Sequence, residues 1–165
     1  MNIFTKQYDI ESFLKGSSVD FKHRSYASLL SQSNLELELR HNYIQCMFPT
    51  DEPSQFVNVP TISVPDAQKL GQNESVRMNL HLATKRMIRF YTETSHWIRW
   101  GNHNYRRISR ILRCLRIFGC NKDADLFYEK VCMPVITKCC INVDQKTVQY
   151  WDQNNQIVAE GGSCE

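Results

Sequence analysis

The stretch NHNYRRISRILRCLRIFG, residues 102–119, decides the fold class of this chain. Its apolar residues recur every three or four positions, at Tyr105, Ile108, Ile111, Leu112, Leu115 and Phe118. At the helical step of 100° they fall within about 140° of one another, which is the buried stripe of an amphipathic helix. The Asn-His-Asn at its start and Gly119 at its end suit the two ends of a helix. We therefore expect an α-helix here.

Arginines occupy the other side of this predicted helix. They are Arg106, Arg110 and Arg113 opposite the stripe, with Arg107 and Arg116 on its flanks. The surrounding residues 94–122 contain no Asp or Glu, and like charges three or four positions apart destabilise a helix. Two interpretations of this basic helix stay open. Carboxylates elsewhere in the fold neutralise the arginines, or an anionic ligand or nucleic acid binds their guanidinium groups.

Helical spacing of apolar residues extends along most of the chain. Helices are expected over 21–31, 35–47, 63–91, 123–131 and 134–150, with the 63–91 helix either continuous or restarting near Glu74. Residues 8–14 are expected to form a short helix or an extended segment. Prolines at 49, 53, 60 and 65 predict a long irregular loop over 49–65, lying against the surface, with room for a strand fragment around 56–59. The predicted fold is all-α, a single compact bundle of about five to seven helices over residues 1–152. Residues 153–165 are expected to form a polar, frayed C-terminal tail.

Length and composition fit one globular domain. The chain has 165 residues, of which 42% are hydrophobic and 22% charged, and its net charge is only +3. No apolar run approaches the roughly 18–20 residues of a membrane span. The N-terminus lacks the apolar segment of a secretory signal. We expect a cytoplasmic or nuclear and perinuclear protein without a transmembrane segment.

The seven cysteines do not predict a metal site or a disulfide framework. Their number is odd, no Cys-x-x-Cys occurs, and the closest pair is the adjacent Cys139 and Cys140. Buried free thiols are the better interpretation. Because no phosphate-binding glycine loop, serine-hydrolase motif or zinc-protease motif occurs either, we expect no metal and no cofactor.

Two long motifs carry a family resemblance. The first is LELELRHNYIQCMFP at residues 35–49, and the second is HNYRRISRILRCL at residues 103–115. With MIRFY at 87–91 and Tyr150-Trp151, they occur in the order typical of the opioid growth factor receptor conserved region, which this chain resembles from about residue 8 to 151. The chain departs from that pattern at Cys46, where the family usually has Trp, and at Thr92, where Gly is usual. The resemblance implies a receptor-like module that binds a peptide.

The two His-Asn-Tyr motifs supply the candidate ligand-binding residues, which are His41, Asn42, Gln45, His103, Asn104, Arg106, Arg107 and Arg110. His41 and Gln45 share one face of the expected helix. If the motifs pack together, these two residues, His103, Arg107 and Arg110 line one polar pocket. Alternatively, the histidines are buried hydrogen-bonding groups that join two helices. In that case Asn102 or Asn104 caps the second helix.

Three functions fit this pattern. The leading hypothesis is a non-enzymatic recognition domain that binds a peptide or acidic partner through the basic helix and the His-Asn-Tyr motifs. The second is a nucleic-acid or nucleotide binder, or a phosphodiester-directed enzyme with His41 and His103 as catalytic acid and base. The third is a structural protein-interaction scaffold. Trp97 and Trp100 flank Arg99 as a further aromatic and basic cluster, with at least one tryptophan expected in the core.

Overall fold

The computed structural model describes residues 8–55, 59–138 and 140–157. Within these ranges the chain is helical without any strand, apart from an isolated bridge between Val19 and Ser25. The all-α prediction is confirmed. None of the helices in the described part has the length and apolar character needed to cross a membrane.

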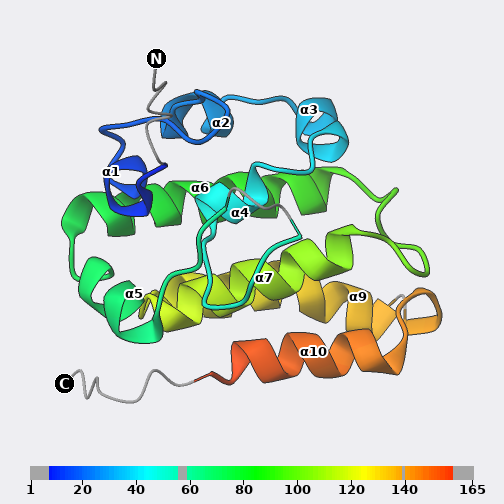
Figure 1. Cartoon of the computed structure of the whole chain (residues 1–165). Helices are drawn as coiled ribbons and strands as arrows, with labels where there is room; N and C mark the ends of the chain where they lie inside the picture. Colours follow the sequence, from blue (N-terminus) through cyan, green and yellow to red (C-terminus); the bar gives the residue numbers. More distant parts are fainter. Residues whose placement is uncertain (1–7, 56–58, 139, 158–165) are drawn as a thin grey trace.

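Two long helices form the centre of the molecule (Figure 1). They are α6, Glu74–Glu93, and α7, Asn104–Ile117. The short helices α1 (Ile10–Leu14), α2 (Tyr26–Leu30) and α3 (Asn34–Leu39) lie above α6 in this view. Below it, α7 packs against α8 (Asn121–Phe127) and α10 (Gln145–Asn155). The predicted apolar stripe of α7 is confirmed, since its six residues are all buried.

Side-chain caps place several of the helix starts. Ser33 Oγ accepts from the amide of Glu36, whose carboxylate in turn accepts from the amide of Ser33, which completes a capping box at α3. Ser63 caps α5, Val64–Leu70, and Asn73 caps α6. The chain therefore restarts before Glu74 rather than running through as one helix.

The expected helix over 35–47 is divided, and this prediction was wrong. It ends at Leu39, passes through extended backbone at Arg40, and resumes as α4, Ile44–Met47. In a continuous helix the carbonyls of Leu37 and Arg40 would accept from amides four residues later. Here both carbonyls accept from the guanidinium of Arg107 instead. The stop before Pro49 is confirmed.

The C-terminal region also differs from expectation. Residues 133 and 134 do not interrupt a helix, because α8 continues through a π-helical turn, Tyr128–Cys132, into α9, Met133–Lys138. The wider turn changes the hydrogen-bond register just before Pro134, which has no N–H to donate. No single helix spans 134–150, since a short 3-10 turn, Cys140–Asn142, precedes α10. The expected boundary at residue 152 lies inside α10, and residues 158–165 lie outside the described part.

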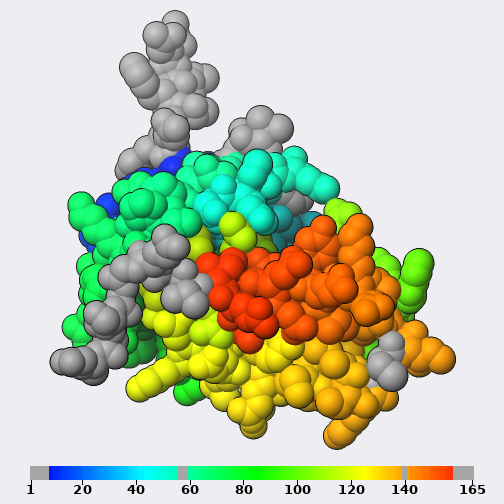
Figure 2. Space-filling model, turned by 90° about the horizontal axis from the view of Figure 1, so that it is seen from below, coloured from blue at the N-terminus to red at the C-terminus, as the bar shows by residue number. Residues whose placement is uncertain are grey.

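The proline-containing segment after α4 packs into the molecule. Thr50, Val59 and Ile62 are buried, and the amide of Ile62 donates to the carbonyl of Thr50 over 3.1 Å. Figure 2 shows α10 lying across this face beside the segment. Of the predicted strand fragment, residues 56–58 fall outside the described residues, so that prediction is not tested.

Candidate binding site at the two His-Asn-Tyr motifs

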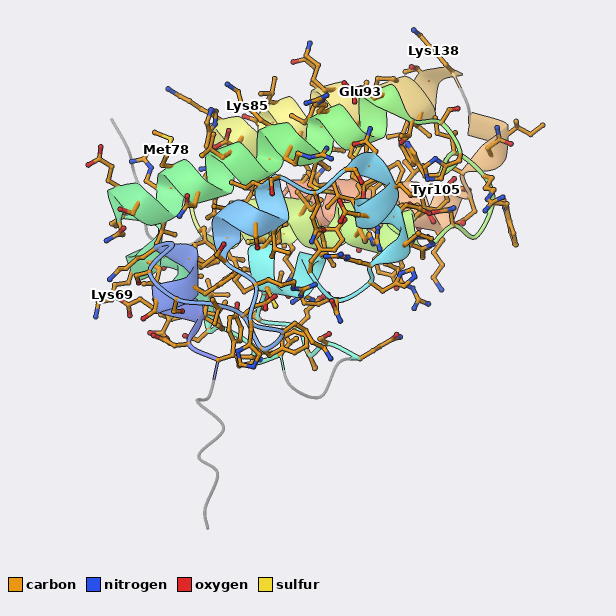
Figure 3. All side chains as sticks on the ribbon, turned by 90° about the horizontal axis from the view of Figure 1, so that it is seen from above. Lys69, Met78, Lys85, Glu93, Tyr105 and Lys138 are labelled. Atoms are coloured by element: carbon orange, nitrogen blue, oxygen red, sulfur yellow. The ribbon has the colours of Figure 1, made fainter. Side chains whose placement is uncertain are left out.

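The two His-Asn-Tyr motifs meet at one end of the molecule. The rings of His41 and His103 pack edge to face, with 5.0 Å between their centroids. His41 lies in the break between α3 and α4, and His103 directly precedes α7, whose first turn contains Tyr105, labelled in Figure 3. The N-cap of α7 is His103, which has no side-chain capping hydrogen bond, so the expected cap by Asn102 or Asn104 was wrong. Asn102 instead accepts from the first helical amide, that of Asn104, over 2.9 Å.

Arg107 points inward and holds the first motif in place. Its two terminal nitrogens donate to the carbonyls of Leu37 and Arg40 over 2.9 and 2.8 Å. One of them also lies 3.2 Å from His41 Nδ1, and the guanidinium stacks 5.4 Å from the centre of the Tyr43 ring. Arg107 is only 5% exposed. It therefore positions the main chain around His41 and is not available to a ligand.

Glu38 is the carboxylate that connects the motifs, and sequence reasoning missed this role. It accepts from Asn104 Nδ2 over 3.0 Å and lies 3.1 Å from His96 Nε2 and 3.3 Å from His103 Nε2. Although burial opposes its ionisation, the hydrogen bonds from Asn104 and His96 and the nearby His103 lower the pKa of Glu38 below its ordinary value. The position of Glu38 three residues before His41 in the first motif was the sequence signal that could have indicated this role. No motif pointed to His96.

The ring of His103 is biased toward its neutral form. Burial and the positive charge of Arg107 lower the pKa of His103 below its ordinary value of 6.5, and Glu38 only partly offsets them. The side chains of His103 and His96 nevertheless stay 41% and 42% exposed. Both imidazoles are thus accessible while sharing one partly enclosed carboxylate.

Three of the predicted ligand-binding residues turn away from this cluster. Asn42 Oδ1 accepts from Arg24, and the Nε of Arg110 donates to the carbonyl of Phe48 over 2.9 Å. Gln45 belongs to α4, so it does not share a helix face with His41 as expected. The single pocket that was expected to hold His41, Gln45 and Arg110 together is therefore not formed, because the helix break redirects the second half of the first motif.

The other arginines of the basic helix have internal partners. Arg113 donates two hydrogen bonds to the carboxylate of Asp51, of 2.7 and 2.8 Å. Arg116 is 9% exposed and binds Asp125 and Asn155. Of the two interpretations of the basic helix, neutralisation within the fold applies to these arginines. Arg106 differs from them, since it is exposed and has no hydrogen bond or ion pair within the described ranges.

Exposed basic and aromatic side chains also occur in the chain segment between His96 and Arg106. We call the exposed residues of this segment, together with His41, which packs on His103, the histidine surface. It consists of His41, His96, His103, Arg99, Trp100 and Arg106. Trp100 is 76% exposed, whereas Trp97 is buried and donates to the carbonyls of Tyr91 and Thr94, which confirms one core tryptophan. No group of side chains in the described part of the chain is arranged to hold a metal ion.

The buried thiols have no evident chemical role. Cys46, Cys114, Cys120 and Cys132 are free and buried, as expected for those four positions. Burial raises the pKa of the Cys46 thiol to about 12 and that of Cys120 to about 11. Such thiols stay protonated near neutral pH and are poor nucleophiles.

Comparisons with models of known protein families, with curated proteins and with solved structures found no match.

Proposed function

We propose that this chain is a recognition domain of the opioid growth factor receptor type, which binds an acidic peptide segment of a partner protein at the histidine surface. The observation that carries the proposal is the contact between His41 and His103, because it joins the two resemblance-bearing motifs into one exposed site. The resemblance by itself suggested a peptide ligand. The unpaired cations at this end supply the preference for an acidic one.

The charge of the site supports an anionic partner. Arg99 and Arg106 are exposed and have no carboxylate partner within the described residues, and Trp100 lies next to Arg99. Exposed arginine and tryptophan are the residue types enriched at binding hot spots. Complementary charge speeds and orients the docking of an acidic segment. The carboxylate of Glu38 does not face a ligand directly, because it is largely enclosed by His96, His103 and Asn104.

The ligand-binding set is narrower than the one expected from the motifs. His41, His103 and Arg106 keep that role, and Asn104 acts through its hydrogen bond to Glu38. Arg107 and Arg110 are committed to main-chain carbonyls, and Asn42 to Arg24. The proposed ligand contacts therefore lie at the start of α7 and not at the arginines further along it.

The proposal is tested with a library of short fluorescent peptides rich in Asp and Glu, measured by anisotropy at two salt concentrations. We expect saturable binding that weakens in the Arg99→Ala, Arg106→Ala double variant by about thirtyfold, since each truncation at a hot spot costs about 1 kcal/mol or more and 1.4 kcal/mol corresponds to tenfold. The matched control is Arg77→Ala, Lys85→Ala, which removes two exposed positive charges from α6.

The control makes the test specific. If both double variants weaken binding equally, general charge attraction explains it and the site is refuted. The same holds if no peptide of the library binds the unmodified chain.

Phosphodiester chemistry is a second candidate, and one observation favours it. Glu38 lies against His103 as a carboxylate that orients a catalytic imidazole would, and a neutral His103 is able to accept a proton. Arg107 argues against it, because its terminal nitrogens donate to carbonyls and leave no buried cation for a phosphate. Cleavage of a fluorogenic RNA oligonucleotide that disappears in His41→Ala, His103→Ala would favour this function over peptide binding.

A further inference from the structure

A second candidate site contains none of the residues of the histidine surface and lies where the connection between α2 and α3 runs alongside α6 (Figure 1). A hollow of about 420 Å³, open to solvent on one side, is lined there by residues 30–34 together with Arg86 and Arg89. Figure 3 shows the part of α6 concerned, between the labelled Lys85 and Glu93, running beside α2 and α3. The lining combines two guanidinium groups with amide and hydroxyl groups.

Arg86 is a half-buried cation without a carboxylate partner. One terminal nitrogen donates to the carbonyl of Gln32 over 2.7 Å and to Asn34 Oδ1 over 2.9 Å. The other is buried and has no hydrogen-bond partner in the described part of the chain. Burial, together with the charge of Arg89, lowers the pKa of Arg86. Since a buried charge is costly unless it is paired, an anion at this point would be stabilised.

Arg89 adds a second cation one turn further along α6. Its Nε donates to Glu93 over 2.8 Å, and its side chain remains 70% exposed. Its two terminal nitrogens have no partner among the described residues. Because residues three positions apart are neighbours on a helix, Arg86 and Arg89 border the hollow on the same side. The carboxylate of Glu93 accepts from Arg89 Nε and from Asn34 Nδ2, so it offsets only one of the two guanidinium charges.

Gln32 contributes an acceptor to the same hollow. This residue is 7% exposed, and its Oε1 is buried without a hydrogen-bond partner within the described ranges. A simple anion would leave this oxygen unsatisfied. A ligand that carries a hydroxyl or N–H next to its anionic group would satisfy both Gln32 and Arg86.

We propose that this hollow binds a small oxyanion ligand, with a carboxylate or phosphate oxygen on Arg86 and Arg89 and an adjacent hydroxyl or N–H donating to Gln32. The site shares no residue with the histidine surface. The proposal therefore does not rest on the peptide binding proposed above. The guanidinium fork of arginine suits both kinds of oxyanion, so the two sources are distinguished by experiment.

The probes are lactate, propionate and inorganic phosphate, each titrated against chloride at matched ionic strength and followed by amide NMR shifts. We expect saturable shifts at residues 31–34 and 86–89. In Arg86→Gln and in Arg89→Gln the dissociation constant should rise about tenfold or more, because a hydrogen bond to a charged group is lost. Arg77→Gln, on an exposed part of the same helix, should bind as the unmodified chain does.

The contact with Gln32 allows a more specific test, the comparison of lactate with propionate. Lactate differs from propionate by one hydroxyl, so the unmodified protein should bind lactate more tightly, and Gln32→Leu should abolish that preference. If phosphate binds more tightly than lactate, the natural ligand is a phosphate ester, and the reverse order assigns a hydroxy acid. Arg89→Gln keeps the test decisive if Arg86→Gln does not fold, since Arg89 is mostly exposed. Shifts that do not saturate, or that are the same in Arg77→Gln and Arg89→Gln, overturn the proposal.

Discussion

Arg107 determines the course of the main chain far from it in sequence. Its guanidinium accepts no hydrogen bond and donates to two carbonyls that lie 70 and 67 positions earlier. Those carbonyls would otherwise continue α3 toward α4. With the chain turned at Arg40, His41 comes against His103 and the candidate site forms. The same side chain thus explains both a helix end and the approach of two motifs.

Replacing Arg107 by Met keeps most of the side-chain volume and removes these hydrogen bonds. We expect the free energy of unfolding to fall by about 3 kcal/mol, because two carbonyls lose charged donors and stay enclosed. Urea denaturation followed by circular dichroism measures the change. Arg106→Met is the matched control on the exposed side of the same turn and should alter stability by less than about 0.5 kcal/mol. Equal effects of the two substitutions would contradict this role for Arg107.

At the scale of elements, α10 is held against α7 by Trp151. This side chain is fully buried, its Nε1 donates to the carbonyl of Tyr105 over 3.1 Å, and its ring lies edge to face with that of Tyr105. The neighbouring Tyr150 is 51% exposed. One residue faces the core and the next faces solvent, as the 100° step of a helix requires.

Trp151→Ala should lower the free energy of unfolding by about 3–5 kcal/mol, since truncating a buried aromatic residue leaves a cavity in addition to the lost apolar burial. Tyr150→Ala should change it by no more than about 0.5 kcal/mol. Thermal and urea unfolding of the two variants check this difference. A small loss for Trp151→Ala would mean that α10 does not stabilise the rest of the bundle.

The whole molecule should be most stable between about pH 6.5 and 9. At pH values below 6.5, the ordinary pKa of histidine, His103 is protonated more readily in the unfolded chain, because its pKa is lowered in the folded protein. Stability therefore falls as the pH drops below this value. The pKa values of Glu38 and Asp51 are also lowered, the latter by the hydrogen bonds from Arg113. Their contribution is complete above their ordinary values of 4.5 and 3.8 and is lost as the pH falls further.

At alkaline pH the dependence of stability on pH has the opposite sign, and stability falls as the pH rises. Burial raises the pKa of Cys46 and Cys120 above the ordinary value of 9.0, so the unfolded chain loses these protons first and stability falls above that pH. Urea midpoints measured across the pH range should therefore pass through a maximum. A midpoint that stays constant as the pH falls through 4.5 would contradict the electrostatic roles given to Glu38 and Asp51.

Local patterns in the sequence were enough to predict the all-α class and the core of the longest helices. The stripe of α7 and the stop before Pro49 depend on neighbours within one or two helical turns. Periodicity and caps act over this distance, so they can be read without knowing the fold. The repeated His-Asn-Tyr motif also singled out His41 and His103, whose rings pack together in the structure.

Only the tertiary structure decided the direction in which each arginine points and where the first motif breaks. An arginine on the flank of a stripe has the same local pattern whether it meets solvent, the carbonyls of α3 or Asp51. The choice depends on acceptors brought from more than 60 positions away, as for Arg107 and Arg113. For the same reason the meeting of Glu38 with His96 could not be foreseen. The basic character of the helix is a property of the sequence, whereas the packing decides which of its charges stay exposed.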